Sequence, residues 1–179
     1  KLNAKDYVII HPGSGFLTQL KYPSRFWPSE RYSKVADFIL KKYKVILTGS
    51  PDEKKFAEEI IKKIKNKKDI IDLSGKLSLG EISALVSKAR MVIVTSTGIA
   101  HISSALNAKM VHLSGPDEDH WHPWSPKEQC TIIQHTEVCT GCEKVYCRKK
   151  TQECMLAITP EEVINAVNEL LKTSKIKGE

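Results

Sequence analysis

Short apolar segments alternate with helix-like segments along nearly the whole chain. The apolar runs, each of a length typical for a strand, lie at residues 7–10, 44–48, 70–73, 91–94, 110–113 and 131–133. Apolar residues at the spacing of a helix with one buried face occur at 31–43, 51–64, 79–86, 98–106 and 160–171. Strands that alternate with helices form a parallel sheet joined by right-handed crossovers. The sequence therefore predicts an α/β fold, a Rossmann-like parallel sheet with helices on both faces.

Capping boxes mark three of the helix starts. A serine or threonine is followed three residues later by glutamate in Ser50–Glu53, Ser78–Glu81 and Thr159–Glu162. In such a box the two residues satisfy backbone N–H groups that the first helical turn leaves unpaired. These sites predict where the second, third and last helices begin.

The size and charge of the chain limit the fold and function classes to which it can belong. Its 179 residues suffice for one domain with a sizeable core, and its net charge is +7. Nearly all the positive charge is lysine, and the densest run, 62–68, falls on the polar side of a predicted helix, so a solvated face is the simplest interpretation. The second interpretation is attraction to an anionic membrane surface or acceptor. Nucleic-acid binding is the third, because nucleic-acid-binding proteins favour arginine.

The chain starts without an initiator methionine and enters a strand almost at once. We therefore expect it to be a piece of a longer protein. We expect one Rossmann-like domain at 1–174, with a cysteine-rich loop at about 139–154, and a tail at 175–179 that frays.

Small residues follow two of the predicted strands. The first set is Gly13-Ser14-Gly15, and the second is Ser96-Thr97-Gly98, which leads directly into a helix. A helix N-terminus offers unpaired N–H donors and partial positive charge, which suit phosphate. Ligands of parallel sheets bind at the carboxyl ends of the strands, where both sets and Thr48-Gly49 fall. The alternative is an ordinary helix cap and a tight turn.

Two common nucleotide-binding classes do not fit. A dinucleotide fingerprint needs a third glycine after Gly13 and Gly15 and an acidic residue at the end of the second strand, and this chain has Thr48-Gly49 there. A Walker lysine motif is also missing from the sequence.

Several motifs, in order, resemble the C-terminal half of glycosyltransferase family 9, which contains the lipopolysaccharide heptosyltransferases. They are the Pro12-Gly13 loop, Arg25-Phe26-Trp27-Pro28, Gly49-Ser50-Pro51-Asp52-Glu53, Ser96-Thr97-Gly98-Ile99-Ala100-His101, a Gly-Pro after the fifth strand, a Trp-x-Pro, and a cysteine loop ending in Cys154-Met155. Each is weak alone, but their order and spacing are specific.

The resemblance implies the C-terminal, donor-binding half of a two-domain GT-B fold. Its reaction would be inverting transfer of a sugar, heptose above all, from a donor such as ADP-heptose to a lipid-linked, lipopolysaccharide-core-type acceptor. The acceptor site and the general base would lie on an N-terminal domain absent from this chain, so this chain alone would be inactive. The resemblance also implies a cytoplasmic enzyme that can contact the inner membrane, with no required cofactor and no nucleic-acid partner.

The resemblance also assigns roles to residues. Arg25 would stabilise charge on the leaving diphosphate. The donor-binding residues would be Gly13, Ser14, Gly15, Thr48, Gly49, Glu53, Ser96, Thr97, Gly98 and His101. Each has a simpler interpretation as well: a surface arginine, a capping-box glutamate or a structural histidine. Ser96 departs from the family pattern, which commonly has aspartate there, so the identity of the donor sugar stays open.

Cysteines cluster near the C-terminus with the spacing C-x2-C-x4-C-x6-C. They are Cys139, Cys142, Cys147 and Cys154. Such a set could bind a structural metal, pair as disulfides or remain as thiols. The acidic and histidine run at 117–122 fits no standard metal spacing, and we expect a ligand-facing loop held down by Trp121 and Trp124.

Two other function classes stay open at this stage. The first is a metal-knuckle module that docks a partner through its lysine-rich surface. The second, disfavoured by the missing acidic residue, is an NAD-dependent oxidoreductase.

Overall fold

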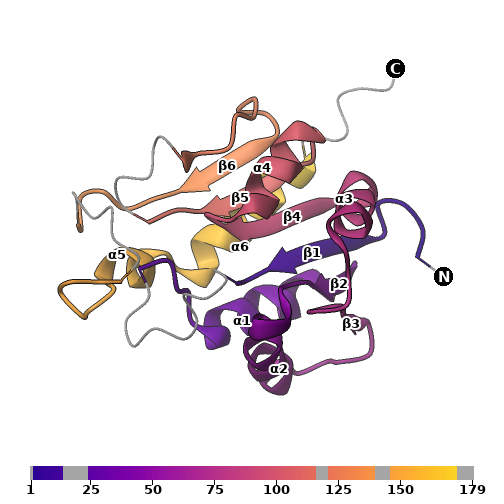
Figure 1. The fold of residues 1–179 in the computed structure, drawn as a ribbon, viewed down its shortest axis with the longest axis horizontal. Coiled ribbons are helices and arrows are strands. Elements are labelled where there is room, and N and C mark those ends of the chain that lie inside the picture. Colours follow the sequence, from indigo (N-terminus) through magenta and orange to yellow (C-terminus); the bar gives the residue numbers. More distant parts are fainter. Residues whose placement is uncertain (1, 14–23, 116–120, 140–145, 173–179) are drawn as a thin grey trace.

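The computed structural model describes residues 2–13, 24–115, 121–139 and 146–172. Its centre is a six-stranded, fully parallel sheet in the order β3-β2-β1-β4-β5-β6 (Figure 1). The strands are β1 Tyr7–His11, β2 Lys44–Leu47, β3 Ile70–Asp72, β4 Met91–Thr95, β5 Met110–Leu113 and β6 Cys130–Ile133. The predicted parallel α/β sheet is confirmed, and each predicted apolar run is a strand.

Helices cover both faces of the sheet, as expected (Figure 1). The helices are α1 Ser29–Ile39, the 3-10 turn η2 Pro51–Glu53, α2 Lys54–Lys63, α3 Leu79–Lys88, α4 Gly98–Ala105, α5 Glu153–Ala157 and α6 Pro160–Lys172. Helices α1, α2, α5 and α6 contribute to one hydrophobic core, and α3 and α4 contribute to the other. Within the described residues, every helix is too short or too polar to cross a bilayer.

Each strand sends alternate side chains into the two cores. In β1, Val8 and Ile10 enter the core beneath α1 and α6, whereas Tyr7 and Ile9 enter the core beneath α3. Because both faces are buried, both sets are apolar, which explains why the strand sequences show no polar alternation.

Helical segments begin at the three predicted capping boxes. The Thr159 N–H donates to Glu162 Oε2 at 2.7 Å, and the Glu162 N–H donates to Thr159 Oγ1 at 3.2 Å. Ser78 and Glu81 make the same reciprocal pair. At Ser50 the first turn is the 3-10 element η2, and Glu53 accepts the Ser50 N–H at 2.6 Å.

Two predicted boundaries were wrong. Helix α1 begins at Ser29 and ends at Ile39 rather than spanning 31–43, because Pro28 starts the helix and residues 41–43 turn toward β2. The cysteine-rich segment is not all loop, since α5 begins at Glu153 and buries Cys154 and Met155. The preceding Gln152 has a left-handed backbone, with φ of 53°, which no sequence signal indicated.

The chain order reverses at the centre of the sheet, between β1 and β4. The helices α1 and α4, which follow these two strands in the described chain, pack on opposite faces of the sheet. In open parallel sheets such a point forms a ligand-binding crevice at the carboxyl ends of the strands. The Thr95 hydroxyl at the end of β4 donates to the Gly13 carbonyl at 2.9 Å and ties the two loops together.

Candidate functional site

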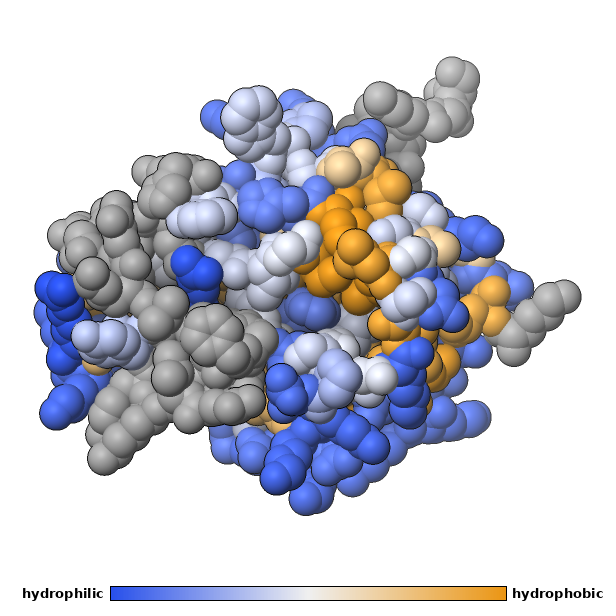
Figure 2. Space-filling model, in the orientation of Figure 1, coloured by the Kyte–Doolittle hydropathy of each residue, from blue (hydrophilic) through white to orange (hydrophobic). Residues whose placement is uncertain are grey.

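An open groove of about 490 Å³ lies at this crevice. Its lining residues are His11, Gly49, Ser50, Glu53, Leu77, Leu79, Ile82, Ser96, Thr97, Gly98, Ile99 and Ile102. The groove therefore brings together five of the predicted donor-binding residues from two distant loops. Its other wall is apolar, and hydrophobic residues gather over α3 and α4 on the same face of the molecule (Figure 2).

Glu53 is the most constrained residue of the groove. Its side chain is only 3% exposed, and its carboxylate packs against two glycines. A Cβ atom at Gly13 would lie 1.9 Å from Glu53 Oε1, and one at Gly49 would lie 3.0 Å from Oε2. The absence of side chains at these positions makes the space that the carboxylate occupies. Glu53 is thus both a capping residue and a buried acid at the floor of a groove.

Two buried neutral groups flank this carboxylate. His11 Nδ1 lies 3.0 Å from the Thr48 hydroxyl, and burial lowers the pKa of His11, opposed by the charge of Glu53. The Tyr32 hydroxyl donates to the Pro12 carbonyl at 3.3 Å, and burial together with Glu53 raises the pKa of Tyr32. Thr48 is buried and does not line the groove, but its hydroxyl contacts His11, which does.

The N-terminus of α4 opens into the same groove. Thr97 is the N-cap residue, but its side chain does not cap the helix, and its buried Oγ1 has no hydrogen-bond partner within the described part of the chain. Gly98 is exposed, and a Cβ added there would meet no atom within 4 Å. The first-turn N–H groups of a helix lack intrahelical acceptors, so this end can receive an anion.

Beside α4, a buried histidine lies near several other basic side chains. His112 on β5 is fully buried, and its Nε2 lies 3.3 Å from the Ser96 hydroxyl. Burial above all, and then the nearby basic side chains of His122, His101 and Arg25, lower the pKa of His112 to about 3. This electrostatic effect places predicted residues Arg25 and His101 in the same neighbourhood as Ser96, although neither lines the groove among the described residues.

The buried His112 should make the fold sensitive to acid. Its pKa is about 3 in the folded protein and about 6.5 in the unfolded chain. Between these two pH values the unfolded chain binds a proton at this residue and the folded protein does not. We expect the free energy of unfolding to fall between pH 6.5 and 3, with this residue costing about 2 kcal/mol near pH 5.

Urea unfolding near pH 7.5 and pH 5 measures this effect. The variant His112→Gln should lose less stability between the two pH values than the unchanged chain. The loss will not vanish, because His11 is also buried with a lowered pKa. An equal loss in both proteins would show that His112 is not the titrating group.

Some predicted residues lie outside the described part of the structure. These are Ser14, Gly15, Cys142 and residues 117–120. The expected packing of Trp121 and Trp124 was wrong, because their side chains are 54% and 94% exposed. Sequence reasoning also missed His11, His112 and the apolar wall. His11 directly follows an apolar run, which was the available signal.

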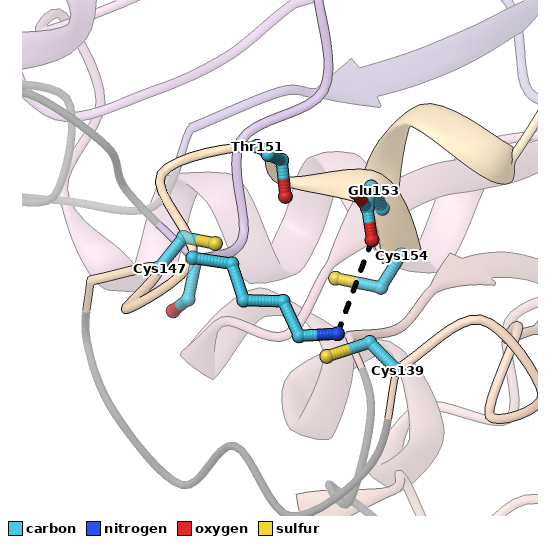
Figure 3. A pocket seen from close by; sticks show the side chains of 7 residues that line it. Cys139, Cys147, Thr151, Glu153 and Cys154 are labelled. Atoms are coloured by element: carbon cyan, nitrogen blue, oxygen red, sulfur yellow. Dashed lines mark ion pairs between the residues drawn. The ribbon is translucent and has the colours of Figure 1, made fainter.

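Three of the clustered cysteines converge on one small cavity. Cys139, Cys147 and Cys154 line a cavity of about 20 Å³ beside the ion pair of Lys149 and Glu153, whose atoms are 4.0 Å apart (Figure 3). Within the described residues, no three His, Cys, Asp or Glu side chains are grouped to hold a metal ion. A structural metal at this cluster stays a hypothesis.

Comparison with known proteins decides the family. The sequence model of glycosyltransferase family 9 (heptosyltransferase) matches residues 2–152. The chain belongs to glycosyltransferase family 9. This membership favours the sugar-nucleotide hypothesis over the metal-knuckle module and the oxidoreductase.

Individual members of family 9 are similar to this chain in sequence and structure. The chain is 29% identical over 157 residues to lipooligosaccharide heptosyltransferase 2 of Haemophilus influenzae, covering 83% of this chain and 44% of that protein. It is 28% identical over 175 residues to lipopolysaccharide heptosyltransferase 3 of Escherichia coli, covering 95% and 48%. The solved structure of E. coli ADP-heptose lps heptosyltransferase II matches with a TM-score of 0.79 at 24% identity, covering 97% and 49%. The chain thus spans about half the length of these family 9 relatives.

Proposed function

We propose that this chain is the donor-binding half of an inverting heptosyltransferase. The donor would be a nucleotide diphosphate sugar, ADP-heptose above all, and the acceptor a lipid-linked saccharide of the lipopolysaccharide-core type. The observation that carries the proposal is the groove itself, in a family 9 chain. It combines a buried carboxylate fitted against two glycines with an open helix N-terminus.

The groove offers complementary groups for each part of such a donor. The N-terminus of α4, with Thr97 and Gly98, would receive the diphosphate, and Ser96 and His101 would lie beside it. The Glu53 carboxylate would accept hydrogen bonds from ribose hydroxyls. The apolar wall, which includes Leu79 and Ile102, would take the base.

Arg25 would act on the leaving group. Departure of the nucleoside diphosphate adds negative charge to its terminal phosphate, and a fixed cation stabilises that charge. The influence of Arg25 on His112 supports this position, because His112 contacts Ser96 at the edge of the groove. Ser14 and Gly15 keep their proposed donor-facing role, as does Thr48 through His11.

The remaining parts of the proposal concern the whole enzyme. Residues 1–174 would form the donor domain and 175–179 a tail. An N-terminal domain would supply the acceptor site and the general base, so this chain alone would bind donor without turnover. The enzyme would work on the cytoplasmic side of the inner membrane. Sugar transfer from a nucleotide sugar is a group transfer and requires no redox cofactor, and metal analysis of the purified chain tests a structural metal at the cysteines.

Calorimetric titration with ADP tests the donor site and the role of Arg25. The chain should bind ADP saturably, and Arg25→Ala should weaken binding by about tenfold to a hundredfold, the value of a charge-assisted hydrogen bond. Lys34→Ala is the matched control, since Lys34 is an exposed cation on α1.

A comparison of ADP with AMP sharpens the test. Arg25→Ala should affect AMP less, because AMP lacks the terminal phosphate. Absence of ADP binding by the unchanged chain at millimolar nucleotide would refute the donor-site proposal. Equal ADP affinity in Arg25→Ala would refute the role of Arg25 alone.

A further inference from the structure

A second and larger cavity, of about 660 Å³, lies at the opposite edge of the sheet. It is formed by the end of α1, the end of α6 and the residues that lead into β2 and β4. Its lining residues are Val8, Phe38, Ile39, Lys41, Lys42, Tyr43, Arg90, Val167, Asn168, Leu171 and Lys172. Tyr43 and Arg90 directly precede β2 and β4, so this amino-edge groove opens away from the donor groove. The proposed function makes no use of it.

The amino-edge groove has two chemical parts. Its apolar surface is made of the partly exposed side chains of Phe38, Tyr43 and Leu171, which lie over the buried Ile39 and Val167. Lysine and arginine side chains make cation–π contacts with the two aromatic rings. Lys41 Nζ lies 5.7 Å from the Phe38 ring centroid, and Lys42 Nζ and the Arg90 guanidinium carbon lie 5.5 and 5.3 Å from the Tyr43 centroid. Such contacts orient a cation over an apolar surface without neutralising it.

Positive charge is crowded around Arg90. The Lys5 ammonium donates to the Ala89 carbonyl at 2.9 Å, and Arg90 Nε donates to the Lys5 carbonyl at 2.9 Å. Burial lowers the pKa of both Lys5 and Lys109, and the Arg90 charge lowers each further. These cations therefore repel one another while carbonyl oxygens hold them in place.

In the described part of the chain, few carboxylates offset this charge. Asp6 and Asp69 lie on an adjoining shallow surface with Lys41, Lys42 and Lys44. Glu169 pairs with Lys172 at 2.7 Å, an exposed pair that contributes little. Among the described residues of this edge, the cations outnumber the carboxylates, so the groove is electropositive as well as apolar.

We propose that the amino-edge groove binds an anionic phospholipid, with an acyl chain along the apolar surface and the phosphate at Lys41, Lys42 and Arg90. A nucleic acid would contact the cations through its phosphates but would leave the apolar surface of the groove uncovered. A small anion such as free phosphate would do the same. A phospholipid satisfies both parts, because apolar burial and attraction to lysine and arginine add together. This binding would attach the domain to an anionic membrane independently of donor binding.

Vesicle co-sedimentation of the purified chain tests the proposal. Binding should be strong to phosphatidylcholine vesicles that contain phosphatidylglycerol and weak to phosphatidylcholine alone. The double variant Lys41→Glu, Lys42→Glu should lose affinity for the anionic vesicles by more than about tenfold. The matched control is Lys62→Glu, Lys67→Glu, which reverses two exposed lysines of the densest basic run and should lose much less. All variants should keep the thermal unfolding midpoint of the unchanged chain.

Two further measurements separate the lipid from other sources of the effect. Phe38→Ser, which removes part of the apolar surface without changing charge, should also weaken vesicle binding, and soluble glycerol phosphate should not compete. Equal losses in the two double variants would overturn the proposal in favour of general electrostatic attraction. Full competition by glycerol phosphate would indicate a small-anion site instead, and absence of binding to anionic vesicles would end the proposal.

Discussion

Replacing Gly13 with alanine is expected to remove most of the ADP affinity, although the change adds a single methyl group. The new Cβ would lie within 2.0 Å of the Glu53 carboxyl carbon, so the carboxylate must leave its position. Gly49 and the Ser50 N–H hold it on the other side, so it can move only by giving up its hydrogen bond. We expect a loss of ADP affinity of about tenfold or more and of about 1–3 kcal/mol in stability, measured by calorimetry and urea unfolding.

The control for Gly13 is Gly80→Ala in α3, where an added Cβ meets no atom within 4 Å. That change should leave ADP affinity unaltered and stabilise the helix slightly. A mutant cycle with Glu53→Ala then isolates the cause. Once Glu53 is truncated, Gly13→Ala should have almost no further effect. A full additional loss in that background would show that Glu53 does not mediate the effect.

The second large effect is expected at Trp27. Its side chain is completely buried, packs edge-on against Tyr32 with centroids 4.7 Å apart, and donates its indole N–H to the Ile158 carbonyl at 2.9 Å. We expect Trp27→Ala to cost about 3–5 kcal/mol, enough to lower the thermal midpoint by about 10 °C. Because Trp27 fixes the segment that carries Arg25, ADP affinity should fall as well.

Two variants control the Trp27 result. Trp27→Phe keeps most of the apolar volume but removes the indole N–H that the Ile158 carbonyl accepts, while the Arg31 guanidinium still donates to that carbonyl. It should therefore cost about 1 kcal/mol, the net value of one hydrogen bond. Trp124→Ala makes the same large truncation at a side chain that is 94% exposed and should change stability by less than about 0.5 kcal/mol. If Trp27→Ala were as mild as Trp124→Ala, the indole would not anchor this part of the fold.

The sheet and helix starts were predictable because their signals are local. A strand buried on both faces is apolar throughout, as Met91–Thr95 shows, and the boxes at Ser78 and Thr159 satisfy backbone groups within one turn. Helix α5 was missed because five residues carry too little periodicity to show a face.

The candidate site was predictable only in part. The α4 start and the glycines are local features, and the family resemblance linked them. The fit of Glu53 against Gly13 depends on two segments that meet only through the β1–β2 pairing. The side chains around His112 come from four separate segments, so no single stretch of sequence indicates this group. The exposure of Trp124 also depends on tertiary structure, because tryptophan composition alone favours burial.

The hydrogen bond from Thr95 to the Gly13 carbonyl has a consequence for when the proposed donor groove can form during synthesis. The two residues are 82 positions apart, and β4 inserts directly against β1. A nascent chain that has emerged only through β3 has the floor of the groove but lacks the wall that would receive phosphate. If the groove binds nucleotide as proposed, binding would have to wait until β4 has joined the sheet, and nucleotide would stabilise the finished domain but not its partly synthesised precursor.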